Sequence, residues 1–391
     1  QSTLLSSVFT KNAKKNTDGQ ITNVICNSAK QGLIPQREYF DKDIANSDNT
    51  SGYYIIEEND FVYNPRKSAD APYGPISRYK YAEAGIVSPL YLCFRAKKEI
   101  NPSFFEWYFR SSAWHRYVYM SGDSGARHDR VSVKDDTFFA MPINLPSAHE
   151  QEHIASFLER IDQRIEKQRA LVESLKKYKR GVFEMVFSQK VRLIPKSKRK
   201  DWRNYKLSDF TTRVTRKNGG QSDIPLTISA QYGLIDQRDF FSKTIASADM
   251  SGYYLLRSGE YAYNRSTSND YPFGSIKRLE LYPMGAVSTL YLCFRVKDDI
   301  VLSDLAKWYF ESSQWHRGVN EICAEGARNH GLLNVPTDGF FNTVHTLPSD
   351  PEEQLAIASY LSLFQARLDS AQAVLEKLLR IRSGLMQRLF I

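Results

Sequence analysis

Two short stretches of the sequence contain residue types that could catalyse a reaction. The first, HEQEH at His149–His153, matches the HExxH pattern of zinc hydrolases, in which two histidines one helical turn apart bind the metal. An internal repeat of this region, described below, has Glu352 and Ala356 at the histidine positions, and the sequence signals no third ligand. Glu150 is also explained as the partner of Ser147, three residues before it, in a predicted helix capping box. We therefore expect no metal site here.

The second stretch, DAPY at Asp70–Tyr73, is similar to the D/N-P-P-Y/F signature with which amino-methyltransferases hold a target amine. Ala71 replaces the first proline, and the repeat has DYPF at Asp270–Phe273. Neither stretch is accompanied by a glycine-rich cofactor loop, and the chain has no GxxxxGK[ST] loop for ATP. We therefore predict no catalytic residue, so that any catalyst would have to come from another chain.

The remaining candidates are residues that could bind nucleic acid, because donors and acceptors recognise base edges while Lys and Arg contact phosphates. The stretch at Tyr63–Arg78 corresponds to the stretch at Tyr263–Arg278, with similar ends and different centres. A shared scaffold with a changed centre suits two related binding sites, and the alternative is a solvated loop that varies freely. The predicted base contacts are Asn64, Arg66, Lys67, Asn264, Arg265, Ser266 and Asn269. Arg78 and Arg278 are predicted to bind phosphate, with surface salt bridges as the alternative.

A second candidate loop lies at Ser121–Arg130 and returns at Cys323–Gly331. Its small residues would let the backbone approach DNA closely, and an arginine in each copy would supply a charge-assisted contact. The alternative is an ordinary turn. The candidate residues are Arg127, His128, Arg130, Arg328 and Asn329. The neighbouring Trp-His pairs at 114–115 and 315–316 are predicted to be structural.

These paired stretches belong to a repeat that extends along the whole chain. SGYYIIEENDFVYN at Ser51–Asn64 returns as SGYYLLRSGEYAYN at Ser251–Asn264, which is 200 positions later. EQEHIASFL, which begins at Glu150, returns as EQLAIASYL from Glu353, which is 203 positions later. A period of this length is too long for a solenoid unit, so the pattern indicates a tandem duplication of a domain.

The composition sets broad limits on the class of protein. A length of 391 residues suggests two to three domains, and 42% hydrophobic with 25% charged residues is ordinary for a soluble protein. The net charge of +9 suits nucleic-acid binding but also many enzymes. No stretch reaches about 18 apolar residues and the N-terminus does not resemble a signal peptide, so we expect a cytoplasmic protein without a membrane segment. The four cysteines lack CxxC spacing and are predicted to be reduced.

Each copy of the repeat combines a globular part with a long helix. Residues 1–146 and 202–348 alternate aromatic and β-branched runs with turn residues, which predicts mixed domains of sheet and helix. Residues 147–189 and 349–391 instead place apolar residues at alternating steps of 4 and 3, which predicts coiled-coil helices. Residues 190–201 form a basic linker.

We therefore predict an α+β protein with two similar mixed α/β globular domains. An antiparallel coiled coil of the two long helices would separate them, with a pseudo-two-fold relation between the copies. The alternative is that each helix packs on a different protein. Lys179 and Arg382 occupy equivalent slots of the two helical seams, where a charge weakens a coiled coil unless its head group reaches solvent.

The order of globule, LP, EQ..IA..L and heptads, written twice, resembles the specificity subunit of type I restriction–modification systems. The motif falls on Leu145, Pro146, Glu150, Gln151, Ile154 and Leu158, and again on Leu347, Pro348, Glu353, Gln354, Ile357 and Leu361. The resemblance covers essentially the whole chain. One departure is that DWRNYKLSDF opens the second globule at Asp201, whereas the first begins near LSSVF without the matching first turn.

The resemblance implies two target-recognition domains, each for one half of a split double-stranded DNA site. It implies that the long helices space these halves and dock two adenine-N6 methyltransferase subunits, with the motif residues Glu150, Gln151, Ile154, Leu158, Glu353, Gln354, Ile357 and Leu361 at the docking and spacer helices. It also implies a chain without cofactor, because S-adenosylmethionine would be bound by the methyltransferase subunits, and ATP and Mg by restriction subunits where these assemble. The alternative is a non-catalytic structural adaptor with two related protein-binding modules on a coiled-coil rod.

Overall fold

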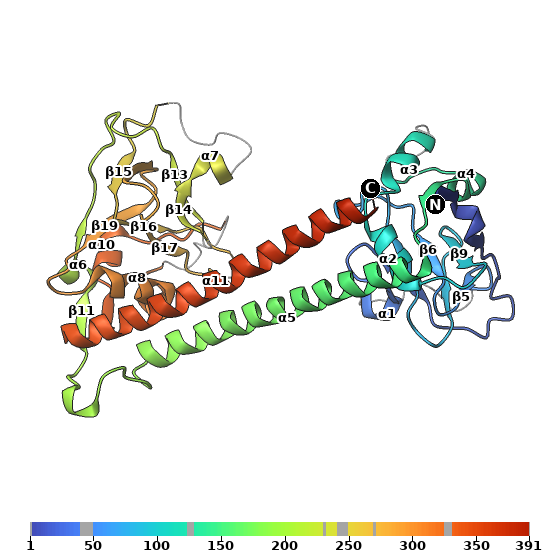
Figure 1. The fold of residues 1–391 in the computed structure, drawn as a ribbon. Helices are drawn as coiled ribbons and strands as arrows, with labels where there is room; N and C mark the ends of the chain where they lie inside the picture. Colours follow the sequence, from blue (N-terminus) through green and yellow to red (C-terminus); the bar gives the residue numbers. More distant parts are fainter. Residues whose placement is uncertain are drawn as a thin grey trace. The chain divides into compact units, whose positions relative to one another are not determined.

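The computed structural model describes residues 2–39, 50–122, 129–229, 232–240, 249–268, 271–323 and 331–390 (Figure 1). By its contacts the chain forms two compact units. Unit 1 comprises Gln1–Arg169 and Ala373–Ile391, and unit 2 comprises Ala170–Gln372. Each unit therefore contains one globular part of the repeat together with a segment of both long helices.

Unit 1 contains a four-stranded antiparallel sheet in the order β2-β9-β6-β7. Its strands are β2 (Phe9–Lys11), β9 (Leu92–Ala96), β6 (Phe61–Tyr63) and β7 (Ile76–Arg78). Three antiparallel strand pairs accompany it: β1 (Ser2–Leu4) with β10 (Pro142–Asn144), β3 (Ile25–Ser28) with β4 (Gly32–Pro35), and β5 (Tyr54–Ile56) with β8 (Gly85–Val87). The short helices are η1 (Leu5–Ser7), α1 (Gln36–Tyr39), α2 (Pro102–Arg110), α3 (His115–Ser121) and α4 (Asp135–Phe139).

Unit 2 repeats this architecture, with a four-stranded antiparallel sheet in the order β12-β19-β16-β17. Its strands are β12 (Thr211–Arg213), β19 (Leu292–Val296), β16 (Tyr261–Asn264) and β17 (Ser275–Arg278). The strand pairs are β11 (Arg203–Lys206) with β20 (Val344–Leu347), β13 (Leu226–Ser229) with β14 (Gly233–Asp236), and β15 (Tyr254–Arg257) with β18 (Met284–Val287). The short helices are η3 (Lys196–Lys198), α6 (Leu207–Phe210), α7 (Gln237–Phe240), α8 (Ser303–Glu311), α9 (His316–Ile322) and α10 (Thr337–Phe341). The predicted mixed α/β repeat is therefore confirmed.

Aromatic side chains from the sheet and from one amphipathic helix form the core of each unit. In unit 1 the ring of Phe61 on β6 stacks on Phe94 of β9 with 5.7 Å between centroids, and α2 packs against both rings. In unit 2 Tyr261 stacks on Phe294 at 5.3 Å, and α8 takes the place of α2. The extra hydroxyl of Tyr261 donates to the carbonyl oxygen of Ser303 at 2.6 Å, so burial leaves no polar group without a partner there.

The two predicted long helices are present as α5 (Ala148–Phe187) and α11 (Pro351–Phe390), and they pack together along the predicted seam (Figure 1). In unit 1 Asp162 of α5 contacts Arg382 of α11, and in unit 2 Lys179 of α5 contacts Gln365 of α11. The contacts run in opposite directions along the two helices, so the pair is antiparallel. The buried seam residues include Leu158, Ile165, Val172, Leu175, Val182, Val186, Ile357, Leu361, Leu368 and Ala371.

The two charged seam positions are satisfied in different ways. Arg382 forms an ion pair with Asp162, whereas Lys179 donates to Gln365 at 2.6 Å and lies over the rings of Phe183 and Trp308. Asp162 and Gln365 occupy equivalent positions of the repeat, 203 apart. Burial lowers the pKa of Lys179, because its charged form loses contact with water. The two positions at which the seam was expected to be weak are therefore both satisfied. Arg382 is in an ion pair, and Lys179 is shielded from water by two aromatic rings.

A buried histidine distinguishes the core of unit 2 from that of unit 1. The Nδ1 atom of His345 lies 3.1 Å from the hydroxyl of Tyr309, and its Nε2 atom lies 2.8 Å from the hydroxyl of Thr343. Thr343 donates its proton to the carbonyl of Phe340, so these bonds fit a neutral ring that accepts from Tyr309 and donates to Thr343. Burial lowers the pKa of His345 to about 4. The matching position of unit 1 is Ile143.

Acidification should therefore destabilise unit 2 through His345. The pKa of His345 is lower in the folded chain than the ordinary value of 6.5, so the unfolded chain binds more protons between pH 6.5 and about 4. Its unfolding free energy should fall by roughly 3 kcal/mol over this interval as the pH decreases. Hydrogen–deuterium exchange of β11 and β20 between pH 4 and 7 measures this loss. His345→Ile, which copies unit 1, should remove it; an unchanged pH dependence in that variant would contradict the assignment.

Candidate nucleic-acid interface

The two candidate loops of each copy, far apart in the sequence, are joined by main-chain hydrogen bonds. In unit 1 the amide of Lys67 donates to the carbonyl of Asp129 at 2.8 Å, and the amide of Val131 donates to the carbonyl of Pro65 at 2.9 Å. We call residues 64–68 and 129–131 loop pair 1. In unit 2 residues 264–268 and 331–333, loop pair 2, are joined by the bonds Thr267 to Gly331 (2.7 Å) and Leu333 to Arg265 (3.0 Å).

This pairing corrects the alignment of the second loop between the copies. Arg66 lies opposite Arg130 in unit 1, and Ser266 lies opposite Leu332 in unit 2. Asp129 is therefore equivalent to Gly331 and Arg130 to Leu332, a shift of 202, although the GAR motifs are 201 apart. One residue has been added to the second copy between the motif and the paired segment. Arg130 thus has an apolar counterpart rather than a polar one.

The first residue of each loop pair shapes the loop instead of extending from it. Asn64 accepts a hydrogen bond from the amide of Arg66 at 3.1 Å, and Asn264 accepts one from the amide of Ser266 at 3.0 Å. Asn64 also donates to the carbonyl of Asn27 at 3.3 Å. Asn64 and Asn264 are both half-buried. The side-chain oxygens of Asn64 and Asn264 therefore close a turn of the loop, and their contact with bases stays a prediction.

A glycine permits the close approach that closes each loop. Gly74 has φ of 81° and Gly274 has φ of 75°, which is the left-handed region that glycine adopts without strain. A Cβ atom at either position would lie 2.1 Å from a carbonyl oxygen, that of Asn64 or that of Asn264. No other residue fits there without displacing the start of the loop. The sequence analysis did not select these glycines, although both occupy the same slot of the two copies.

A buried tyrosine supports each loop from below. The hydroxyl of Tyr63 donates to the carbonyl of Tyr73 at 2.8 Å, and that of Tyr263 donates to the carbonyl of Phe273 at 2.9 Å. Burial raises the pKa of both tyrosines. The rings of His115 and His316 pack on Tyr73 and Phe273, and the indoles of Trp114 and Trp315 donate to main-chain carbonyls at 2.9 and 3.0 Å. The two Trp-His pairs are therefore structural, as predicted.

Loop pair 1 presents cations without counter-ions among the described residues. Arg66 and Lys67 are exposed, and neither forms an ion pair with a described residue. Arg130 is half-buried, and its Nε atom has no hydrogen-bond partner in that part of the chain. Ser266 is exposed in loop pair 2. The predicted contacts Arg127, His128, Asn269, Arg328 and Asn329 lie outside the described residues.

Arg265, predicted to contact bases, is instead folded onto the main chain of its own unit. Its guanidinium donates to the carbonyls of Leu290 at 3.0 Å and Val335 at 3.4 Å. The equivalent residues of unit 1, Pro65, Leu90 and Val133, are among those lining a cavity of about 330 Å³. Proline at this position thus leaves space in unit 1 where unit 2 has a guanidinium. The base contact of Arg265 stays a prediction, and its guanidinium would first have to leave these carbonyls.

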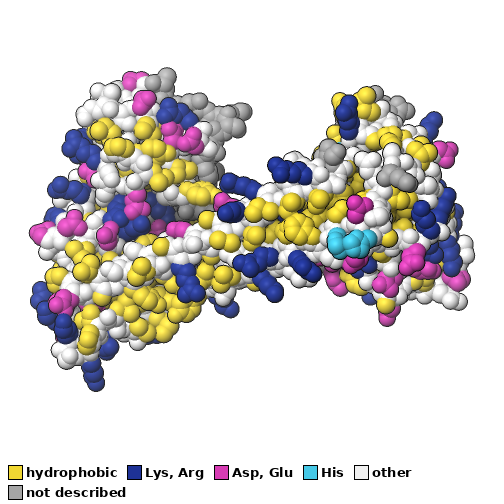
Figure 2. Space-filling view, in the orientation of Figure 1, with side chains coloured by type: hydrophobic (Ala, Val, Ile, Leu, Met, Phe, Trp, Pro, Cys, Tyr) yellow, Lys and Arg dark blue, Asp and Glu magenta, His cyan; other side chains and the backbone are white. Residues whose placement is uncertain are grey.

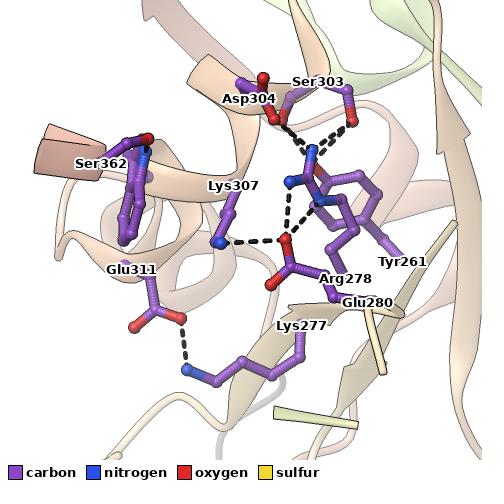
Figure 3. Close-up of polar contacts among 10 residues, drawn as sticks. Tyr261, Lys277, Arg278, Glu280, Ser303, Asp304, Lys307, Glu311 and Ser362 are labelled. Atoms are coloured by element: carbon purple, nitrogen blue, oxygen red, sulfur yellow. Dashed lines mark hydrogen bonds and ion pairs between the residues drawn. The ribbon is translucent and has the colours of Figure 1, made fainter. Parts of the chain in front are cut away.

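The guanidinium groups of the predicted phosphate contacts Arg78 and Arg278 are both engaged within their own units. Arg278 forms ion pairs with Glu280 and Asp304 and bonds Ser303 at 3.2 Å, with its side chain 15% exposed (Figure 3). Arg78 donates to Asn59 and Ser103 and lies 3.7 Å from Glu106. These are the salt bridges named as the alternative, and phosphate binding by either arginine stays a prediction.

The residues that open the long helices, which were predicted to dock partner subunits, make contacts within their own units. Glu150 accepts from the amide and the hydroxyl of Ser147, both at 2.9 Å, in the predicted capping box, and these bonds lower the pKa of Glu150. Gln151 donates to the carbonyl of Pro146 at 3.0 Å. The predicted docking residues that are wholly buried in their own unit are Leu158, Glu353, Gln354, Ile357 and Leu361, and Ile154 packs against the core of unit 1.

The second helix start differs from the first. Glu353 does not cap its helix but accepts two hydrogen bonds from Arg192 and one from the indole of Trp202 at 3.1 Å. Glu353 is fully buried, and its carboxylate raises the pKa of Arg192. Gln354 bonds the main chain at residues 300, 302 and 348. The basic linker is thereby fastened to the start of α11.

A row of exposed apolar side chains on the long helices was missed by the sequence analysis. On α5 the row is Phe157, Leu171, Tyr178 and Met185, and on α11 it is Tyr360, Val374 and Ile381. Members of each row are spaced by 7 or 14 residues and flank the seam, and three of them recur at a shift of 203. The space-filling view shows hydrophobic side chains along these helices (Figure 2). A second heptad phase beside the seam was the signal that could have revealed the row.

The zinc-hydrolase pattern has no supporting geometry. His149 and His153 are exposed, with 4.1 Å between ring centroids, and Glu150 is used by the cap. The described residues contain no group of three His, Cys, Asp or Glu side chains that could hold a metal ion. Within the same residues, no helix is both long and apolar enough to span a membrane.

The fold of the whole chain is similar to that of solved structures from type I restriction–modification systems. The HsdS subunit from Thermoanaerobacter tengcongensis aligns with a TM-score of 0.55 and 16% identity over 100% of this chain and 96% of that one. A structure from work on complex assembly and conformational transition of the type I R-M system aligns with a TM-score of 0.60 and 15% identity, over 99% and 96%. The S subunit from M. genitalium gives 0.54 and 11%, over 100% and 96%.

A family model identifies the first half of the chain more closely. Residues 7–176 match the family described as the type I restriction modification DNA specificity domain. Unit 2 repeats the fold of this region. The resemblance inferred from the sequence, to the specificity subunit of type I systems, is therefore confirmed. No curated protein sequence matches the chain.

The anchoring of α11 by a buried ion pair makes Glu353 a sensitive position. Glu353→Gln should leave the Arg192 guanidinium without its carboxylate and lower the unfolding free energy of unit 2 by about 3 kcal/mol. The matched variant Glu150→Gln, at the equivalent but exposed position of unit 1, should have a much smaller effect. Urea unfolding of both full-length variants tests this. Equal losses in the two variants would contradict the distinction between anchor and cap.

Proposed function

We propose that the chain is the DNA-recognition subunit of a type I restriction–modification complex and that each unit recognises one half of a split site. The observation that carries this proposal is that one loop scaffold occurs twice with different outward residues. The turn at Asn64 or Asn264, the glycine at 74 or 274 and the main-chain pairing are the same in both units. Their centres differ: Arg66 and Lys67 are exposed in unit 1, whereas unit 2 has an exposed Ser266 and a half-buried Thr267.

This arrangement suits recognition of two related but unequal half-sites. Arginine can donate to guanine or to phosphate, and serine can bond several base edges at short range. A fixed main chain lets such side chains change without refolding the domain. Arg66, Lys67, Arg130 and Ser266 are the described residues that we propose to contact DNA. Arg127, His128, Asn269, Arg328 and Asn329 remain candidates from the sequence alone.

The catalytic steps are proposed to belong to partner subunits. Two adenine-N6 methyltransferase subunits would bring S-adenosylmethionine, and restriction subunits, where they assemble, would bring ATP and Mg. This is supported by the type I family match and by the absence of a cofactor loop motif in the sequence. In this assignment the chain contributes the choice of DNA site and the spacing between its halves.

The exposed apolar row on α5 and α11 is the surface proposed to dock the methyltransferase subunits. Phe157 is 49% exposed, Leu171 is 43% exposed and Tyr178 is 57% exposed. A row at heptad spacing beside an occupied seam suits a further helix that packs on the pair. Most of the helix-opening residues predicted from the sequence are buried within the units, whereas this row is exposed on the same helices.

Mapping of methylated adenines tests the proposal directly. Genomic DNA from the host, with and without this chain, would be sequenced by a single-molecule method that detects N6-methyladenine. A split motif should disappear when the chain is removed and return when it is restored. If no motif changes while a methyltransferase is expressed, the proposal fails and the adaptor with two protein-binding modules becomes the better account.

Two adjacent residues of α5 test the docking row. Leu171→Glu should abolish co-purification of the methyltransferase subunit, because it places a charge in an apolar interface, and should leave the thermal stability of the chain unchanged. Ala170→Glu is the matched control, since it adds the same charge to an exposed position outside the row. Pull-down of the methyltransferase with each variant gives the result. Equal retention of the partner by both variants would contradict this docking surface.

A further inference from the structure

We infer that the two units hold their DNA half-sites by different chemistry, unit 1 largely by charge and unit 2 largely by neutral contacts. The inference rests on the proposed function and deepens it, because it states how each half-site is bound. It follows from a comparison of equivalent positions in the two loop pairs, whose main chains follow the same hydrogen-bond pattern.

Three positions that are cationic in loop pair 1 are uncharged in loop pair 2. Arg66 and Lys67 correspond to Ser266 and Thr267 in the sequence. Arg130 corresponds to Leu332 by the main-chain pairing, and Leu332 is 43% exposed. Asp129, which corresponds to Gly331, offsets one of the three positive charges. At these four positions loop pair 1 therefore carries a net charge of +2 (three cations and one anion), and loop pair 2 carries none.

The cation that loop pair 2 does contain is not presented outward. Arg265 donates to the carbonyls of Leu290 and Val335, so its guanidinium is bound to the protein main chain. The GAR motif is present in both copies of the sequence, so its arginine does not distinguish them.

The side chains that replace the cations are suited to short-range contacts. Ser266 is exposed and can donate and accept, whereas the hydroxyl of Thr267 lies 3.2 Å from the carbonyl of Gly331 and is partly used within the loop pair. Contacts of this kind release no counter-ions from DNA. Each phosphate contact by Lys or Arg instead makes the logarithm of the binding constant fall by about 0.9 per decade of salt.

The two half-sites should therefore differ in the salt dependence of binding. Three phosphate contacts by Arg66, Lys67 and Arg130 correspond to a slope difference of about 2.7 between the half-sites. The cations of the loop pair would anchor unit 1 on DNA over a range of sequences. Unit 2 would contribute less to affinity at low salt, and proportionally more to discrimination between sequences.

The experiment measures binding of the full chain, assembled with its methyltransferase subunits, to duplexes that carry both halves of the methylated motif or one intact half. Fluorescence anisotropy between 50 and 300 mM KCl gives the slope for each duplex. We expect the steep slope on one single-half duplex and a slope shallower by about 2 to 3 on the other. The triple variant Arg66→Ser, Lys67→Thr, Arg130→Leu, which copies unit 2, should remove the difference.

Three further variants separate this effect from misfolding and from overall charge. The reciprocal variant Ser266→Arg, Thr267→Lys, Leu332→Arg should steepen the shallow slope by about 2 to 3. The variant Lys97→Ser, Lys98→Thr removes two exposed charges that follow the C-terminal end of β9. The loop-bearing strand β6 pairs with the other end of β9, with Tyr63 opposite Leu92, so this variant should change neither slope. If the half-buried Arg130 perturbs folding when replaced, Arg66→Ser, Lys67→Thr alone should lower the steep slope by about 1.8.

The outcomes distinguish the inference from the proposed function. If the wild-type complex prefers the split motif but both single-half duplexes show the same slope, the inference is wrong and the proposed function stands. The same conclusion follows if the folded triple variant keeps the wild-type slopes. If the wild-type complex shows no preference for any split motif, both are wrong.

Discussion

The main-chain pairing between two distant loops is the constraint on which the candidate interface depends. In unit 1 the amides of Lys67 and Val131 bond carbonyls across the pair, and the same bonds recur in unit 2. Because main-chain atoms make these bonds, they do not restrict which side chains point outward. Below the pair a buried tyrosine and a glycine with positive φ fix the path of the chain. The fold thus separates what must stay the same from what can vary.

The same separation applies to the charges between the sheet and its short helix, which is α2 in unit 1 and α8 in unit 2. Lys80 pairs with Glu106 at 2.7 Å in unit 1, and the equivalent pair of unit 2 is Glu280 with Lys307 at 2.9 Å, with the signs exchanged. Figure 3 shows the unit 2 pair within the network around Arg278. An exposed ion pair contributes little stability, but two like charges at one contact repel, so both partners have to change together. Divergence between the copies has preserved the contact and not the residues.

The sequence was sufficient for those features that depend on local periodicity. The heptad steps predicted both long helices, and the spacing of Ser147 and Glu150 predicted the capping box. It was insufficient where the partner of a side chain is distant. Arg78 is engaged by residues 59, 103 and 106, and Arg265 by the carbonyls of residues 290 and 335, and no local pattern indicates such contacts. The repeated motif also predicted docking at Glu353, whose side chain is buried and bonds Arg192 and Trp202.

This distinction has a consequence for how a duplicated recognition protein can change its target. Anchoring residues such as Glu353 and Gly274 each satisfy several contacts at once, so their replacement affects folding before it affects binding. Residues 66, 67, 266 and 267 contribute few contacts within their units, so their replacement affects mainly what lies outside. Two copies of one scaffold can therefore acquire different electrostatic character at the loop pairs while their cores remain alike. In this chain the two copies differ in that loop pair 1 is positively charged and loop pair 2 is neutral at the four compared positions.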